Sequence, residues 1–123
     1  MGRTTKMVAA FMLALCVALS LSGCAHWAAS EDFDKGIAFF NQGNYEAAIP
    51  YFQKATTTDP EYADAYMYLG RSHLNLRQWT KAISPLRTAY RLAPDKTKGL
   101  VQDLIMDAVL GAASQGIKLD KQD

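Results

Sequence analysis

Apolar and polar residues follow two different patterns along the chain. An uncharged, largely apolar run extends from Met7 to Leu21, behind a leader that carries Arg3 and Lys6. Beyond residue 30 the apolar residues recur at three- and four-residue spacing, which is typical of amphipathic helices. Turn-forming or helix-breaking residues interrupt this spacing at Gly43-Asn44, Pro60 and Pro94. The pattern therefore predicts an all-α fold after the apolar run.

The apolar run is too short to cross a bilayer. A helix of this length extends about 22 Å at about 1.5 Å per residue, whereas the hydrocarbon core is about 30 Å thick. A basic leader followed by a short apolar segment predicts a secretory signal peptide over residues 1–23. A retained membrane anchor is the alternative.

The run ends in Leu21-Ser22-Gly23-Cys24, which resembles the bacterial lipobox. The resemblance implies that Cys24 receives a covalent lipid, that the chain is cut before it, and that its new amino group is acylated, for example by palmitate. Several acyl chains anchor a protein stably, whereas one does so only marginally. Ala25, in place of Asp, implies the outer membrane with the protein facing the periplasm. Residues 24–30 are expected to form a lipidated tether.

A second pattern repeats with a period of 34 residues. Small residues and prolines recur in pairs at this period: Gly36 and Gly70, Ala48 and Ala82, Ala55 and Ala89, Pro60 and Pro94. The period and residue types resemble the tetratricopeptide repeat (TPR). The resemblance implies two helix-turn-helix repeats, at residues 31–62 and 63–96, in a short right-handed α-solenoid.

A further helix is predicted over residues 97–116, followed by a frayed polar tail at 117–123. Its apolar residues lie on one face, and Asp103 and Asp107 lie on the solvent-facing side. Such a helix caps the open end of a repeat array. Because about three repeats are usually needed to bury a core, a homo-oligomer or stabilisation by a partner is left open.

The chain departs from the repeat pattern at two places. Asp32 and Lys35 stand where the family has a large apolar residue and Leu, which we interpret as a solvent-facing end of the array. Arg77-Gln78 replaces the Gly43-Asn44 pair of the first repeat, which predicts a strained turn between the helices of the second.

The resemblance also implies a binding surface. In this family the first helix of each repeat lines a concave face that binds peptides. The corresponding partner-binding residues here are Phe33, Ile37, Phe40, Asn41, Met67, Arg71, Leu74, Asn75, Val101 and Ile105. The alternative is that the apolar members of this set fill the narrow inside of a short array as core.

Composition excludes several other functions. The formal net charge is +1, which excludes a strongly cationic nucleic-acid binder. Seven of the eight charges between residues 65 and 98 are basic, which indicates a solvated face. The alternatives are head-to-tail pairing with the acidic repeat of a neighbouring copy, and contact with anionic headgroups or glycans near the membrane. The chain carries no phosphate-loop, zinc or hydrolase motif, and His73 is expected to be a core histidine. We therefore expect no catalysis, no metal and no cofactor besides the lipid on Cys24.

These observations predict a lipid-anchored adaptor of the bacterial cell envelope that binds a protein or peptide partner through its TPR groove. A self-assembling structural lipoprotein without a client is the first alternative. A non-catalytic accessory subunit of an envelope enzyme is the second.

Overall fold

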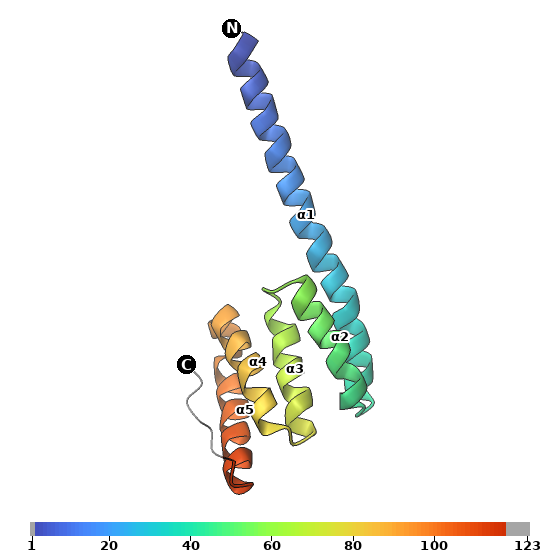
Figure 1. Cartoon of the computed structure of the whole chain (residues 1–123), viewed down its shortest axis with the longest axis vertical. Helices are drawn as coiled ribbons and strands as arrows, with labels where there is room; N and C mark the ends of the chain where they lie inside the picture. Colours follow the sequence, from blue (N-terminus) through green and yellow to red (C-terminus); the bar gives the residue numbers. More distant parts are fainter. Residues whose placement is uncertain (1, 118–123) are drawn as a thin grey trace.

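The computed structural model of the chain describes residues 2–117, with side chains described at residues 7, 8 and 23–117. This part contains five helices and no strand, which confirms the all-α prediction. The helices are α1 (Gly2–Asn41), α2 (Tyr45–Thr58), α3 (Ala63–Asn75), α4 (Trp79–Leu92) and α5 (Pro94–Ser114). In Figure 1 helices α2 to α5 stand side by side next to the C-terminal part of α1, whose N-terminal part extends away from them. Residues 118–123 of the predicted tail, and the side chains of Leu21 and Ser22 in the lipobox, lie outside what is described.

Successive helices run in opposite directions and form an α-solenoid. Helices α1 and α2 make one hairpin and α3 and α4 make the next (Figure 1). Helix α5 packs against α4 and also touches α3. The α2–α3 and α4–α5 connections therefore lie at the end of the array from which α1 extends, and the α1–α2 and α3–α4 turns lie at the opposite end (Figure 1).

Small residues let the two helices of each hairpin approach closely. A Cβ added to Gly36 would lie 2.6 Å from the Phe52 ring, and one added to Gly70 would lie 2.5 Å from Cγ of Leu86. Both of these large side chains are completely buried. The glycines therefore provide the space in which the largest core residue of each second helix sits.

The core has two parts, and α5 completes the second. Ala48, Phe52 and Leu69 form the first buried cluster. The second consists of Ala82, Leu86 and Ala89 from α4 with Val101 and Ala108 from α5. Helix α5 therefore covers the open side of the second repeat, as a capping helix does. It begins at Pro94, a position where the missing N–H of proline costs little.

The two inter-helix turns use the same backbone with different residues. Gly43 has φ +75° and Arg77, one repeat later, has φ +56°. Only glycine adopts this left-handed region without steric cost. The expected strain at Arg77 is thus present. Asn44 caps α2 by accepting a hydrogen bond from the Ala47 amide at 3.2 Å, whereas Gln78 at the start of α4 makes no such bond.

Two expectations about the start of the domain need correction. Residues 24–30 are helical, as part of α1, and Ala29 within them is fully buried. The segment is therefore part of the folded domain and not a tether. Asp32 is not solvent-facing but 6% exposed, and its carboxylate accepts a hydrogen bond from Nζ of Lys54 at 3.0 Å. Within the described residues, no helix combines the length and apolarity that a membrane-spanning helix needs.

Candidate partner-binding site

The predicted groove residues occupy the first helices of the array, and the structure divides them into two groups. Phe33, Ile37, Phe40 and Asn41 belong to α1, and the others belong to α3 and α5. The α1 aromatics are half-buried and pack on the first core cluster. This half of the predicted groove is therefore lined by side chains that also hold the fold together.

An aromatic cluster fills the space between α1 and α3. The Phe33 ring centroid lies 4.9 Å from that of Tyr62 and 5.6 Å from that of Tyr68, and the Phe40 centroid lies 5.2 Å from that of Tyr68. Offset and edge-to-face pairs at these separations are favourable beyond the area they bury. The cluster closes the α1–α3 side of the concave face with side chains of the chain itself.

Arg71 covers the edge of this cluster. Its Cζ lies 5.1 Å from the Phe40 ring centroid and 4.9 Å from that of Tyr68. A guanidinium above aromatic faces at this distance is held by the ring quadrupole. The cation is thereby fixed in place, with no ion-pair partner among the described residues.

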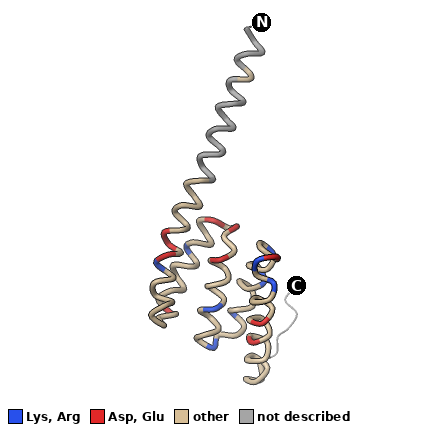
Figure 2. The backbone as a smooth tube through the Cα atoms, turned by 180° about the vertical axis from the view of Figure 1, so that it is seen from behind, with Lys and Arg blue, Asp and Glu red and all other residues tan. Residues whose placement is uncertain are grey.

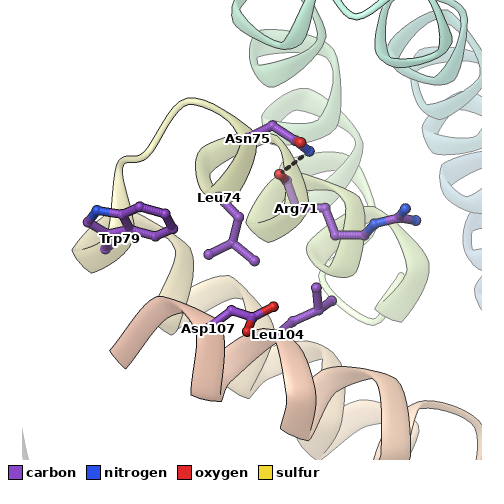
Figure 3. A pocket seen from close by; sticks show the side chains of 6 residues that line it. All are labelled: Arg71, Leu74, Asn75, Trp79, Leu104 and Asp107. Atoms are coloured by element: carbon purple, nitrogen blue, oxygen red, sulfur yellow. Dashed lines mark hydrogen bonds between the residues drawn. The ribbon is translucent and has the colours of Figure 1, made fainter. Parts of the chain in front are cut away.

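A hollow of about 450 Å³ opens between α3, the start of α4 and α5, next to Arg71 (Figure 3). We call it the α3–α5 pocket. Leu74 lies in its middle, with Trp79 on one side and the Arg71 guanidinium directed away on the other (Figure 3). The remaining lining residues are Asn75, Leu104 and Asp107. The Asn75 side chain donates a hydrogen bond to the Arg71 carbonyl at 2.9 Å, which holds its amide at the rim.

Half of this pocket is predicted from the sequence. Arg71, Leu74 and Asn75 belong to the predicted groove, whereas Trp79, Leu104 and Asp107 do not. Trp79 occupies the position of Tyr45 in the previous repeat, and that aromatic pairing was the available signal. Asp107 is predicted only to lie on the solvent-facing side of its helix. That side turns toward α3 at the pocket, which the helical periodicity of one segment cannot reveal.

Val101 does not belong to the accessible groove. It is completely buried and is part of the second core cluster, so the prediction that it contacts a partner is wrong. Met67, Leu74 and Ile105 are partly buried and pack against the same cluster. The core alternative therefore describes Val101, whereas the rest of the α3–α5 side remains partly open.

Trp79 is held firmly at the pocket by α5. Gly111 lies so close to the indole that a Cβ at this position would overlap the ring. The indole Nε1 is buried and has no hydrogen-bond partner within the described part of the chain. The packing of the ring against α5, and not a polar contact, thus fixes this wall of the pocket.

Two polar side-chain pairs lie at the opposite end of the domain. Nδ1 of His26 lies 2.7 Å from a carboxylate oxygen of Asp59, and Lys96 donates to Asp64 at 2.9 Å. The hydrogen bond and negative charge of Asp64 raise the pKa of Lys96. Burial raises the pKa of the Tyr62 phenol, and nearby carboxylates add to this shift. The His26–Asp59 pair joins α1 to the α2–α3 connection, and the Lys96–Asp64 pair joins α5 to α3.

Neither Cys24 nor His73 lies in a catalytic or metal-binding arrangement among the described residues. Cys24 carries a free, exposed thiol on α1. His73 is buried, and its Nδ1 lies 2.7 Å from the side-chain oxygen of Gln78, as suits a core histidine. Among the described residues, no group of three or more His, Cys, Asp or Glu side chains is placed to hold a metal ion.

Comparison with known proteins agrees with this architecture. The tetratricopeptide repeat family matches residues 33–97, which is more than half of the chain. Tetratricopeptide repeat protein 16 of Macaca fascicularis is 31% identical over 70 residues, and its counterpart in Homo sapiens is equally similar. The matched segment covers 57% of this chain but only 8% of the length of either relative. Repeats of this family generally mediate protein–protein interaction and are not catalytic. The match includes both hairpins, and the chain therefore belongs to the tetratricopeptide repeat family.

Proposed function

We propose that the protein is a non-catalytic, lipid-anchored scaffold of the bacterial envelope that binds a protein partner in the α3–α5 pocket. The observation that carries the proposal is the pocket itself, which lies on the side that first helices of TPR arrays present to peptides. An envelope enzyme or an assembling envelope complex would be a suitable partner.

The anchor rests on the N-terminal sequence. A basic leader, a short apolar run and Leu21-Ser22-Gly23-Cys24 occur in the order that lipoprotein processing requires. Cys24 is exposed, so its thiol is accessible to modification. Ala25 favours the outer membrane, with the domain in the periplasm. Replacement of Cys24 by Ser is expected to leave an uncleaved precursor without lipid, whereas normal processing of this variant in a mass spectrum would contradict the anchor.

The chemistry of the pocket specifies the kind of segment that it can hold. Leu74, Leu104 and the Trp79 ring offer an apolar wall, and Asn75 and Asp107 offer polar groups at the rim. In binding clefts of this size, apolar walls hold the bound group while a few polar groups fix its orientation. We infer a helical or extended peptide with an apolar anchor residue, next to a basic group that pairs with Asp107.

Site-specific photocrosslinking tests this proposal in cells. A photoreactive residue is placed at Asn75, on the pocket rim, in the full lipidated chain. The matched control places it at Glu46, an exposed position on α2 outside the pocket. We expect a defined foreign protein to be crosslinked from position 75 and not from position 46.

A charge reversal shows whether the product depends on the pocket. Asp107→Lys alters the rim at an exposed position, so the fold should be retained while the crosslink from position 75 is lost. Equal products from both positions, or none from position 75, would contradict the binding role.

A self-assembling structural lipoprotein is the second candidate, favoured by the exposed side of α5. Met106 is 57% exposed and Leu110 is 60% exposed, on the side of α5 that no other described helix covers. Crosslinks from position 75 confined to copies of the chain itself would support this candidate. Sedimentation as a monomer, unchanged by Leu110→Gln, would exclude it.

A further inference from the structure

Trp27 is an exposed aromatic residue near the proposed anchor. It is 72% exposed, although it belongs to the same helix as the fully buried Ala29. It follows Cys24 by three residues, so the two side chains are neighbours on the helix surface, about 60° apart around the axis. Within the described structure, no packing contact accounts for a tryptophan this exposed and this close to the proposed lipidation site.

The helix around Trp27 is fixed to the domain. His26 contacts Asp59 at 2.7 Å, and its ring lies 5.2 Å from the Tyr62 ring. Asp59 is oriented in turn by the Glu61 amide, which donates to its other oxygen at 3.0 Å. Residues 24–30 therefore form a rigid part of the domain, and Trp27 is held on the helix side that faces away from Ala29.

The position of Trp27 along the helix sets its depth. Three residues of helix rise about 4.5 Å. The polar layer on each side of the hydrocarbon core is about 5–7 Å thick. With the acyl chains of Cys24 in the hydrocarbon, a residue one helical turn away lies within this layer. Tryptophan is enriched there because its ring is apolar and its N–H is polar.

We propose that Trp27 is a second, non-covalent membrane contact that inserts into the interfacial layer of a phospholipid bilayer. The inference rests on the proposed lipid anchor at Cys24 and adds to it a fixed contact between domain and membrane. The His26–Asp59 pair and Tyr62 position the helix so that Trp27 reaches this layer while the domain stays outside. The α2–α3 and α4–α5 connections then face the lipid headgroups, since they lie at the end from which α1 extends (Figures 1 and 2).

Fluorescence of the lipidated full chain in phospholipid vesicles tests the contact. Trp79→Phe leaves Trp27 as the only tryptophan. We expect its emission to shift to shorter wavelength on reconstitution. Phospholipids brominated close to the headgroup should quench it more strongly than phospholipids brominated near the chain ends. If Trp79→Phe does not fold, the difference between the spectra of the native chain and of Trp27→Phe gives the same signal.

A matched control moves the reporter along the helix. Ala38→Trp, in a chain without Trp27 and Trp79, places an exposed tryptophan on α1 about 16 Å further from the anchor. This tryptophan should keep the emission of a solvated indole and escape both brominated lipids.

The outcomes separate the contact from the anchor. A mature chain whose mass lacks lipid at Cys24, and which does not float with vesicles, refutes the anchor and the contact together. A lipidated chain that floats with vesicles, but whose Trp27 emission is neither shifted nor quenched, refutes the contact and leaves the anchor intact.

Discussion

Gly36 and Gly70 occupy equivalent positions in the two repeats, and both are enclosed by a buried side chain of the facing helix. Their spacing of 34 residues indicates the repeat in the sequence. The close approach of the facing helix explains why both residues are glycine. The added Cβ would overlap Phe52 in one repeat and Leu86 in the other, and both of these side chains are fully buried.

Replacement of Gly70 by Ala is expected to lower the free energy of unfolding by about 1–3 kcal/mol, the usual cost of overpacking a core. Gly99→Ala is the matched control, because Gly99 lies in α5 with nothing within 4 Å of its added Cβ. That variant should gain about 0.5–1 kcal/mol from helix propensity. Urea unfolding followed by circular dichroism measures the free energy of unfolding of both variants. If Gly70→Ala and Gly99→Ala changed it by the same amount in the same direction, the packing argument would be contradicted.

Asp32 shows what a single-residue pattern cannot predict. A carboxylate at a position that is usually apolar looked like an exposed residue, but its partner Lys54 is 22 residues away on the next helix. The lysine side chain is 68% exposed, while the Asp32 side chain is only 9% exposed. The pair therefore places one charge at the edge of the core and the other in solvent.

Lys54→Ala is expected to cost about 1 kcal/mol, because it leaves a nearly buried carboxylate without its charged donor. Lys81→Ala, which removes an exposed lysine of α4 without an ion-pair partner in the described structure, should have almost no effect. In thermal or urea unfolding, the double variant Asp32→Leu with Lys54→Ala should recover the lost stability. No recovery would mean that the position does not belong to the packed side of α1.

At the scale of helices and turns, the two hairpins differ in one backbone position. The α1–α2 turn has Gly43 in the left-handed region and a capping Asn44, whereas the α3–α4 turn has Arg77 and Gln78. The sequence predicted this difference correctly, because the alignment of the repeats places Arg77 on Gly43.

Arg77→Gly is therefore expected to stabilise the protein by up to about 1 kcal/mol, since glycine adopts this backbone without the steric cost of a side chain. Gly43→Ala should have the opposite sign in the equivalent turn. Differential scanning calorimetry of both variants measures the shifts in Tm, and a decrease in Tm for Arg77→Gly would show that the arginine side chain makes a contact that outweighs the strain.

The start of the domain was the element least predictable from the sequence. Residues 25–30 carry no clear helical periodicity that would distinguish a helix from a tether. However, no glycine or proline separates Cys24 from Lys35, and three of these residues are alanine, which favours helix. The contacts that fix this segment come from Asp59 and Tyr62, more than 30 residues away. Local patterns do not contain such information.

In the whole molecule, α5 closes the array and completes its core. Two repeats leave the α4 side of the second core cluster open, and Val101 and Ala108 fill it from α5. The apolar periodicity of residues 100–112 predicted this cap. It could not decide which of its apolar residues would be accessible, because the rotation of α5 about its axis depends on how it packs on α4.

Val101→Ala is expected to reduce the free energy of unfolding by about 2 kcal/mol, from lost burial and the cavity that remains. Leu110→Ala, on the exposed side of the same helix, should change it by less than about 0.5 kcal/mol. Chemical denaturation of the two variants distinguishes core from surface. If both variants changed the free energy of unfolding only slightly, Val101 would not be a core residue and could belong to the predicted groove.

The continuous helix α1 also sets the reach of the protein. The α3–α5 pocket is lined by Leu74, Asn75 and Trp79, which flank the α3–α4 turn. This turn lies at the end of the array opposite the end from which α1 extends (Figure 1). Between Cys24 and Asn41 the helix rises about 26 Å. A rigid helix keeps the pocket at a fixed distance from the anchor, whereas a flexible linker would allow a range of distances. With Cys24 anchored as proposed and α1 standing along the membrane normal, the pocket would lie roughly 20–25 Å above the lipid surface, out of reach of proteins that lie flat on the bilayer.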